Sequence, residues 1–390
     1  MPKIVHLSTS HIGGAGISAR RLHRKLLLSG VQSHFVALAK PSFKIENNES
    51  KIIRSLRSRI FGALNTKFSK KLSDKTYLTL LSVTSIKANS LKKYGLPHDT
   101  IFHIHNWFNL INLMELKKLL NLGYKVVFTL HDQRLFTGGC HYSLDCSKFK
   151  LNCKSCPLLA PPINFIPELN LKRAKSVFME HSSQLAIIAP SVWIQKLARE
   201  SNLLKDLVIH QVTNVHGKLM NEDYVRDNQF TIEPRDKIFI GVASVEKSSN
   251  LKGGLILKEI EKLLDQEKVN AEVLYLSDLA SSSGSSNSFW TLIDYLLVPS
   301  VLDNSPNVIH EAKILGIPVI ATEVGGIGEL LNSQYDYSVE LNENTHHVVV
   351  EIIKKILSEK PKIHRKQIIE TYETSVSTSL EQIISIYRNL

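Results

Sequence analysis

The sequence contains no apolar run long enough to cross a lipid bilayer. The longest candidate, residues 76–86, stops at Lys87, well short of the roughly 18 to 20 apolar residues that a membrane-spanning helix needs. The first 30 residues also lack the apolar core and small-residue cleavage site of a secretory signal peptide. These absences predict a cytoplasmic protein without a transmembrane helix.

The marks of a disordered or fibrous chain are missing as well. Of the 390 residues, 43% are hydrophobic and 22% are charged, and the 18 glycines and 13 prolines are ordinary for globular proteins. The sequence has no internal repeat, and its low-complexity tract, residues 281–286, predicts a serine-rich surface loop. This length and composition predict two globular domains.

Short apolar segments alternate with amphipathic segments along the chain. The pattern predicts a helix over residues 15–28 and strands over 3–8, 33–39, 101–107, 126–131, 185–190 and 207–212. After a polar stretch at 214–236, strands are expected again at 238–245, 271–276, 295–299 and 318–322. Strands separated by helices form parallel βαβ units. The sequence therefore predicts an α/β fold with two doubly wound parallel-sheet domains.

Ligands of such sheets bind at the carboxyl ends of the strands, where two loops stand out. Residues 8–16 read S-T-S-H-I-G-G-A-G and lead into a helix, whose N–H groups suit a phosphate or a polar sugar. Gly13 and Gly14 are therefore candidate ligand contacts, although a tight turn without a ligand also favours glycine.

The strongest signal for a site follows the expected strand at 295–299. A polar turn carries Asp303, a helix begins near Pro306, and Glu311 lies about two turns into that helix. The spacing allows both carboxylates to approach one ligand at the helix N-terminus. The stretch G-I-P-V-I-A-T at 316–322 and the pair Gly325 and Gly326 follow. The region predicts an anion site with an acid beside it.

This stretch resembles the donor-binding signature of the retaining glycosyltransferases of family 4, which have the GT-B fold. H-x-H at 103–105, T-L-H-D at 129–132, A-P-S at 189–191 and K-G at 252–253 follow the order of that family. The resemblance implies two Rossmann-like domains that face a cleft. The acceptor-side domain would cover residues 1–214, the nucleotide-sugar domain 215–374, and a final helix, about 375–390, would pack back on the first domain.

The resemblance also implies roles for single residues. Asp303 and His131 would be the catalytic residues in contact with the donor sugar, and Glu311 would bond the ribose. The alternative for His131 is a structural histidine at a strand end. The donor would also be held by Gly13, Gly14, Lys252, Asn304, Ser305, Pro306, Asn307 and Val308, and the acceptor side would contain His103, His105 and Asn106.

The implied activity is retaining, metal-independent transfer of a hexose from a nucleotide-diphosphate donor to a glycan or lipid-linked acceptor. The D-N and P-N pairs around Ser305 resemble a subgroup that makes bacterial surface polysaccharides. No Asp-x-Asp pair occurs in a metal-binding context, so no catalytic divalent metal is expected. The arginine usual before the K-G lysine is absent, with Lys247 as a substitute candidate. The alternatives are a GT-B-like sugar-nucleotide epimerase, or a catalytically silent glycan- or membrane-binding protein.

All four cysteines lie within seventeen residues, and the last two form a C-x-x-C pair. Four thiolates can bind one zinc ion tetrahedrally, which suits a cytoplasmic protein better than disulfides do. The sequence predicts a structural zinc, with two disulfides or reduced thiols as alternatives and His141 as a substitute ligand. The predicted ligands are Cys140, Cys146, Cys153 and Cys156.

Residues 51–93 contain eleven lysines and arginines against one acid, Asp74, a net charge of +10 out of +12 for the chain. Apolar residues from Ile53 to Leu72 recur every three or four positions, which predicts a basic amphipathic helix. Such a helix suits an anionic surface on the inner membrane face, and a solvated face over an ordinary core is the alternative. No nucleic-acid-binding motif is found, so nucleic acid is not an expected partner.

Overall fold

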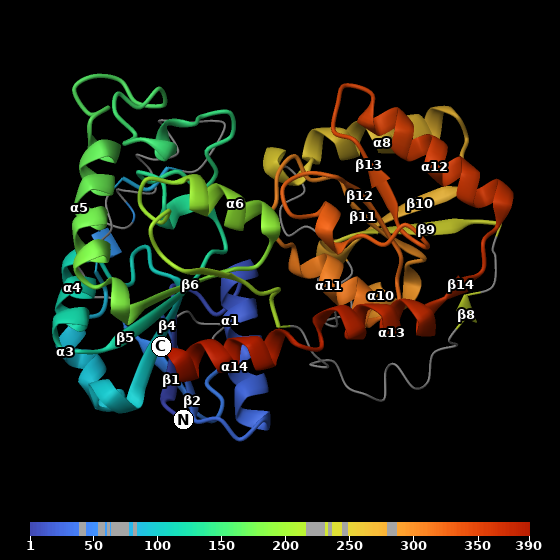
Figure 1. Cartoon of the computed structure of the whole chain (residues 1–390). Coiled ribbons are helices and arrows are strands. Elements are labelled where there is room, and N and C mark those ends of the chain that lie inside the picture. The colour runs from blue at the N-terminus through green and yellow to red at the C-terminus, as the bar shows by residue number, and fades with distance from the viewer. Residues whose placement is uncertain are drawn as a thin grey trace. The chain divides into compact units, whose positions relative to one another are not determined.

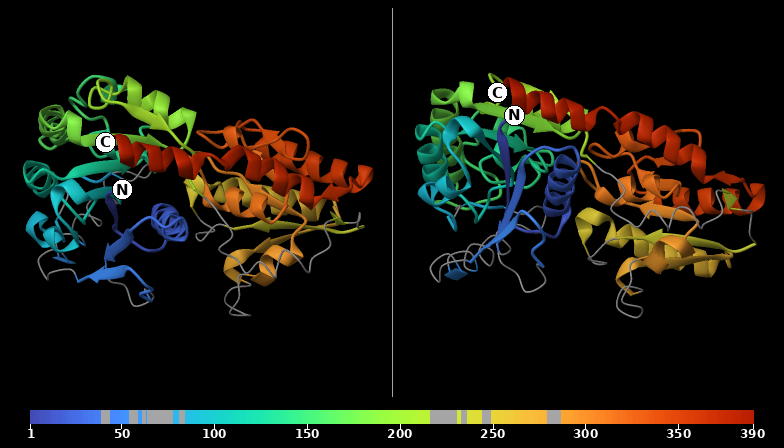
Figure 2. Two further views of the ribbon diagram at one scale, coloured as in Figure 1. Left: turned by 60° about the horizontal axis from the view of Figure 1, so that its bottom comes forward. Right: turned by 90° about the horizontal axis from the view of Figure 1, so that it is seen from below.

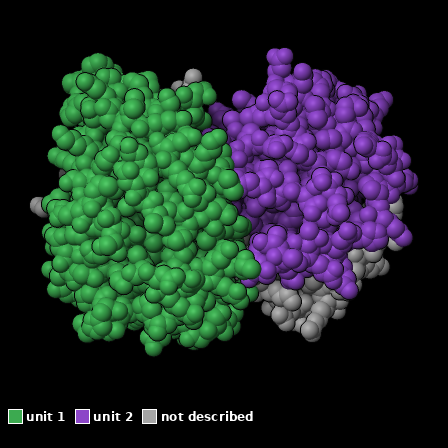
Figure 3. Space-filling model, in the orientation of Figure 1, with its two compact units in different colours: residues 1–215, 378–390 green, residues 216–377 purple. Residues whose placement is uncertain are grey.

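The computed structural model divides the chain into two compact units, which are described separately (Figure 3). Unit 1 comprises Met1–Val215 and Thr378–Leu390, and unit 2 comprises His216–Ser377. The described residues are 1–38, 44–53, 59, 60, 63, 78–80, 84–215, 231, 232, 236–243, 249–278 and 287–390. Most of the expected basic helix, Lys247 and the 281–286 tract lie outside them.

Unit 1 is built on a parallel sheet of seven strands (Figure 1). Its central strands are buried on both faces, which explains why Val, Ile and Phe predominate in them. In spatial order the strands are β3 (Glu49–Ile52), β2 (Ser33–Leu38), β1 (Lys3–Ser8), β4 (Thr100–Asn106), β5 (Lys125–Thr129), β6 (Leu185–Ala189) and β7 (Ile209–Gln211).

The helices of unit 1 cover both faces of this sheet. One face packs under α3 (Ala88–Leu91), α4 (Leu113–Asn121), α5 (Ile166–Glu180) and α6 (Val192–Glu200). The other face carries α1 (Gly14–Leu28) and, beside it, α14 (Ser379–Asn389) from the C-terminal segment. Ile383, Ile386 and Tyr387 of α14 are buried against β-strand residues such as Ile4 and Val127. The core of unit 1 is therefore completed by its last thirteen residues.

Unit 2 contains a parallel five-stranded sheet between two helical layers (Figures 1 and 2). In spatial order its strands are β10 (Ala271–Tyr275), β9 (Ile238–Val242), β11 (Tyr295–Val298), β12 (Val319–Thr322) and β13 (Tyr337–Val339). Its helices are α8 (Gly254–Gln266), α10 (Asn287–Leu292), α11 (Asn307–Ile314), α12 (Thr345–Glu359) and α13 (Arg365–Val376), and β8 (Thr231–Ile232) pairs antiparallel with β14 (Ile363–His364).

The prediction of two parallel-sheet α/β domains is confirmed. The expected helix from residue 51 is wrong at its start, because Lys51 belongs to the edge strand β3, which pairs with β2. Glu49 of β3 is buried beside Arg20, whose Nε donates a hydrogen bond of 2.6 Å to it. Among the described residues, no helix combines the length and the apolar character that a membrane span requires.

Candidate active site

The loops after β9 and β11 of unit 2 are hydrogen-bonded to each other at the K-G turn. The short helix η6 (Asn250–Lys252) ends in Gly253, whose φ of 80° is left-handed. A Cβ atom at this position would collide with the carbonyl oxygen of Pro299. The N–H of Val301 donates a hydrogen bond of 2.9 Å to the Leu251 carbonyl. Glycine is therefore required here, and Lys252 is held at the carboxyl end of β11.

Asp303 is fixed through both its side chain and its backbone. One carboxylate oxygen accepts the N–H of Asn304 at 2.8 Å, and the other forms an ion pair with the Lys252 ammonium. The Asp303 carbonyl accepts the N–H of Gly326 at 3.0 Å, and a side chain at Gly325 would collide with that carbonyl. The Asp303 side chain is 10% exposed and that of Lys252 is 47% exposed. A buried carboxylate thus holds a lysine whose charge solvent and ligands can reach.

Residues 303–308, which the sequence predicts to bind the donor and which are called the donor loop, lead into α11. Its N-cap is Pro306, so no side chain caps the first turn. Ser305 Oγ lies 2.9 Å from Nε2 of His310, and Nδ1 of the same ring lies 2.6 Å from the Tyr372 hydroxyl. His310 is fully buried and Glu311 is half-buried. His310 was not among the predicted site residues. In the sequence it stands out only as a histidine on the apolar face of α11, and its partner Tyr372 on α13 cannot be read from that position.

The glycine-rich loop of unit 1 has two different glycine requirements. Gly13, the N-cap of α1, has a φ of 79°, and a Cβ atom there would meet nothing within 4 Å. Gly14 begins the helix. A Cβ atom at Gly16 would collide with the Ser10 carbonyl. Gly16 is therefore required for packing, whereas the open side of Gly13 leaves room for a ligand.

A small pocket lies at the carboxyl ends of β4 and β5. Asp132 stands at its edge and binds the Arg134 guanidinium at 2.5 to 3.0 Å. Burial would raise the pKa of Asp132, but Arg134 and His141 outweigh burial and lower it to about 2. The pocket is lined by Ile104, His105, Asn106, Trp107, Phe108, Phe128, Thr129, Leu130, His131, Asp132 and Leu135.

His131 enters this pocket as a neutral ring. Burial lowers its pKa to about 4, with Asp132 raising it and Arg134 lowering it further. Its Nε2 lies 3.1 Å from Nδ1 of His105, which also lines the pocket. At neutral pH the pocket therefore offers imidazole groups without a positive charge.

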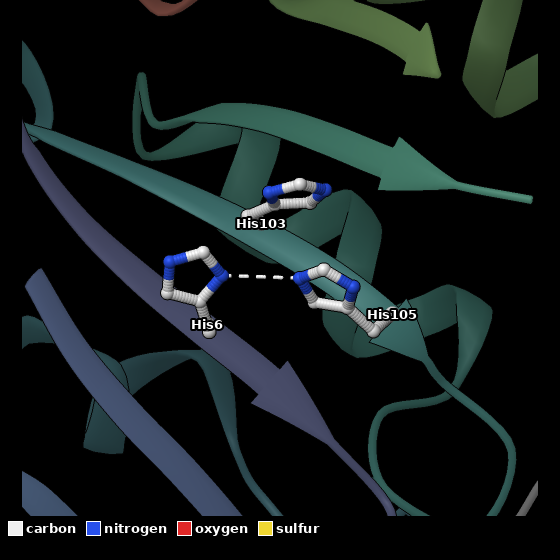
Figure 4. A group of neighbouring side chains, drawn as sticks. All are labelled: His6, His103 and His105. Carbon is white, nitrogen blue, oxygen red and sulfur yellow. Dashed lines mark hydrogen bonds between the residues drawn. The ribbon is translucent and has the colours of Figure 1, made fainter. Parts of the chain in front are cut away.

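Behind the pocket, His6, His103 and His105 gather on β1 and β4 (Figure 4). One nitrogen from each ring lies within 4.8 Å of the others. His6 Nδ1 is 3.0 Å from His105 Nε2, so with His131 both nitrogens of His105 are engaged. His103 is engaged at both nitrogens as well, by the Tyr387 hydroxyl at 2.6 Å and Thr129 Oγ1 at 2.7 Å.

The three rings do not suit a metal ion. A cation would have to break the bonds that occupy both nitrogens of His103 and His105, and its charge would be buried. Burial lowers the pKa of His6 and His105, and the charged groups that add to this shift are other histidines, so no carboxylate in the described part of the chain offsets a positive charge there. The cluster is better described as a hydrogen-bonded network of neutral imidazoles.

The structure brings His105, Asn106 and His131 to one pocket, while His103 lies behind it with no exposed surface. The acceptor-side assignment stays a prediction for His105 and Asn106. His6, Thr129 and Tyr387 were not among the predicted site residues. His6 was detectable as a polar residue in an otherwise apolar strand.

The four cysteines lie in the segment after η3 (Gln133–Leu135), and none forms a disulfide. Burial and then the neighbouring thiols raise the pKa of Cys140 to about 12, and burial raises that of Cys153 to about 11. The backbone N–H groups of Leu158 and Leu159 bond the Cys156 sulfur. In the described part of the chain, the four cysteine sulfurs do not all lie within 4.8 Å of one another. Zinc binding stays a prediction.

No protein-family model matches the chain. The Escherichia coli K12 protein named "Putative colanic acid biosynthesis glycosyl transferase WcaC" is 23% identical, over 97% of each sequence. Among solved structures, Anabaena HepE in complex with UDP-glucose has a TM-score of 0.62 at 15% identity, over 100% of both chains. Sucrose-phosphate synthase of Thermosynechococcus elongatus has a TM-score of 0.61 at 14% identity, over 100% of this chain and 98% of that one. These similarities confirm the GT-B fold.

Proposed function

We propose that this chain is a retaining glycosyltransferase. Its substrates would be a nucleotide-diphosphate sugar and a glycan or lipid-linked acceptor in surface polysaccharide synthesis. The observation that carries the proposal is the accessible Lys252 ammonium paired with the buried Asp303, next to the uncapped start of α11. The similarity to WcaC supports sugar transfer, and HepE, which is solved with UDP-glucose, makes a UDP-sugar the first donor to test.

The charges of this site suit a diphosphate leaving group. The Lys252 ammonium and the N–H groups at the start of α11 would bind the diphosphate, whose charge grows as the glycosidic bond breaks. Asp303, which pairs with Lys252, would lie against the donor sugar, where the transition state acquires positive charge. Glu311, one residue after His310, would accept hydrogen bonds from the ribose.

The transfer would proceed on one face of the sugar. The bond between the anomeric carbon and the diphosphate oxygen breaks, and the acceptor oxygen bonds to the same carbon. The acceptor's proton passes to the departing phosphate, which accounts for both products without an added base. Retention would be read from the anomeric coupling constants of the product by NMR, and activity should persist in EDTA.

Two carboxylate variants test the donor site. Asp303→Asn should reduce kcat by at least about 100-fold with UDP-glucose or another accepted donor, because it removes a charge used in the transition state. Glu311→Gln should mainly raise the donor KM. Glu272→Gln on β10 is the matched surface control. Wild-type kinetics in both site variants would refute the assignment.

A donor panel separates the alternatives. Each nucleotide sugar is incubated without acceptor, and the products are followed by NMR. A new sugar nucleotide would identify an epimerase. Failure to bind any nucleotide diphosphate sugar in calorimetry would favour a catalytically silent protein.

We propose separately that the four cysteines bind one structural zinc ion. The thiols lie close enough to raise the pKa of Cys140, and N–H groups already bond the Cys156 sulfur, as they would a thiolate. Binding requires the segment to draw the sulfurs together. Protein purified without chelator should contain about one zinc per chain, and Cys153→Ser should lower both zinc content and melting temperature. Four titratable thiols in a metal-free active protein would contradict zinc binding.

The basic segment 51–93 supports a further proposal of reversible docking on anionic membranes. Lys51 in β3 is exposed, and Arg54, Arg57, Lys70 and Lys71 lie outside the described residues. Each basic residue near anionic lipid contributes about 1 kcal/mol at low salt. The protein should co-sediment with phosphatidylserine vesicles and be released by salt. Changing these four residues to Glu should abolish sedimentation but not transfer to a soluble acceptor, and equal binding to neutral vesicles would contradict docking.

A further inference from the structure

Unit 2 contains a buried ion pair on the helix that follows the donor loop. Lys313 lies on α11, six positions after Asn307, the first residue of that helix. Its ammonium pairs with the carboxylate of Asp336, immediately before β13, and neither side chain is more than 2% exposed. The ammonium also lies 4.5 Å from the centre of the Tyr335 ring. Every other ion pair between described residues of unit 2 has a partner that is more than a third exposed.

The Asp336 carboxylate joins three parts of unit 2. Besides pairing with Lys313, it accepts the backbone N–H of Val319, the first residue of β12, at 2.9 Å. It also accepts the backbone N–H of Asn332, in the connection between β12 and β13, at 2.7 Å. β12 in turn pairs with β11, and the loop after β11 carries Asp303. One carboxylate therefore ties α11 to the strand beside the donor loop.

A gain in stability alone does not explain a buried ion pair. Taking two charges out of water costs free energy that their attraction offsets only in part, and apolar residues of similar size are often at least as stabilising. Burial lowers the pKa of Lys313 and raises that of Asp336, so burial disfavours the charged form of both groups. An ion pair does supply direction, whereas apolar contacts are non-directional and would let α11 shift along the sheet.

The position of α11 matters for the donor site. The helix start carries the N–H groups proposed to bind the diphosphate, and Glu311 lies on the same helix. Hydrogen bonds weaken within a few tenths of an ångström, so a small shift of α11 would loosen several contacts at once. We propose that Lys313 and Asp336 are positioning residues that hold α11 where it can bind a nucleotide diphosphate. The effect on donor binding rests on the proposed glycosyltransferase function, but the effect on α11 does not.

Two variants separate positioning from stability, with UDP as the probe in calorimetry. Lys313→Met removes the ammonium and leaves the buried Asp336 charge without its partner, so it should lower the melting temperature and weaken UDP binding about tenfold. Lys313→Met/Asp336→Asn removes both charges and keeps an oxygen for one backbone N–H group. This double variant should regain melting temperature relative to the single one, while its UDP affinity stays about tenfold below that of the wild type. Recovery of affinity together with stability, or unchanged affinity in both variants, would overturn the proposal.

A control and a measurement without ligand complete the test. Val349→Ala on α12 lowers the stability of unit 2 through a core cluster that contains no residue of α11, and it should bind UDP as the wild type does. Amide hydrogen exchange of the ligand-free double variant should be faster than that of the wild type in α11 and unchanged in α12. Unchanged exchange in α11, or an equal loss of UDP affinity in Val349→Ala, would also overturn the proposal. If α11 behaves as expected but the wild type binds no nucleotide diphosphate, the proposed function fails and the positioning of α11 stands.

Discussion

Each unit contains a buried histidine held between a tyrosine and a hydroxyl group. In unit 1, His103 lies between Tyr387 of α14 and Thr129 of β5, at 2.6 and 2.7 Å. In unit 2, His310 lies between Tyr372 of α13 and Ser305, at 2.6 and 2.9 Å. In both cases Nδ1 meets the tyrosine, and the two tyrosines lie fifteen residues apart in the sequence.

The two arrangements differ in what surrounds the ring. His103 belongs to a set of neutral histidines, and Thr129 and His105 border a pocket in which the charge of Asp132 is paired with Arg134. His310 instead bonds Ser305 in a loop whose Asp303 forms an ion pair with Lys252 of the neighbouring loop. Unit 1 thus suits recognition of hydroxyl groups, and unit 2 suits recognition of an anion. Four predictions test this difference, beginning with the one of largest effect.

Acid should destabilise unit 1 far more than unit 2. Burial lowers the pKa of His103 to about 3 and of His23 and His131 to about 4, and those of His6 and His105 also lie below the ordinary value. In the unfolded chain these groups bind protons near pH 6.5, whereas the folded unit does not. Stability should therefore fall as pH drops below about 6.5, by about 1.4 kcal/mol per pH unit for each such histidine.

Tryptophan fluorescence can follow the two units separately. Trp290→Phe leaves Trp107 and Trp193 as reporters of unit 1, and the double variant Trp107→Phe/Trp193→Phe leaves Trp290 as the reporter of unit 2. Urea unfolding is measured at pH 7 and pH 5. If both reporters show the same loss of stability between pH 7 and pH 5, the difference between the units is contradicted.

Lys252→Met should weaken donor binding by about 10- to 100-fold, because it removes one charged hydrogen-bonding group from the proposed diphosphate site. Calorimetry with UDP and UDP-glucose measures the effect, and the exposed Lys258→Met on α8 serves as the control. If both variants bind the donor as the wild type does, the anion site of unit 2 lies elsewhere.

Tyr387→Phe and Tyr372→Phe should each lower the free energy of unfolding by about 1 to 3 kcal/mol, because each leaves a buried histidine nitrogen without its partner. Each loss should appear in the reporter of its own unit. Tyr94→Phe is a matched control in unit 1, since no described residue bonds its buried hydroxyl. Losses no greater than that of the control would show that the tyrosine hydroxyls do not hold these rings.

Ser305→Ala should have the smallest effect. It should lower the free energy of unfolding of unit 2 by about 1 kcal/mol and raise the donor KM a few-fold. The hydroxyl is half-buried, so water can replace part of its bond to His310. Kinetics and urea unfolding measure the two effects together. A loss of stability without any change in KM would show that His310 stabilises α11 but does not shape the donor loop.

The sequence predicted the central strands of the two sheets better than the edge strands. The strands β1, β4 and β5 have five to seven residues and are rich in Val, Ile and Phe, and β9, β11 and β12 are also mostly apolar, so each was predicted within a few residues. β3 and β13 have four and three residues and include polar side chains, so no pattern marks them. They are strands because a neighbouring strand offers them hydrogen bonds.

In the candidate sites, too, residues close in the sequence were predicted and partners far apart in the sequence were not. Asp303 and Glu311 lie eight positions apart around the start of α11, so their spacing can be read from the sequence, whereas Lys252 was assigned through the resemblance of its K-G motif. The bonds of His310 to Tyr372 and of His103 to Tyr387 join residues 62 and 284 positions apart. No local periodicity connects such residues, because their contact depends on how helices α13 and α14 pack.

The return of residues 378–390 to unit 1 affects how the protein folds as it is synthesised. A ribosome makes all of unit 2 before it makes α14, so unit 2 can fold as one uninterrupted piece. Unit 1 emerges first, but the apolar surface around Ile4 and Val127 stays uncovered until Ile383, Ile386 and Tyr387 arrive. The first-made half of the nascent chain is therefore the last to be completed, and during that interval the apolar surface of its open sheet face is prone to aggregation.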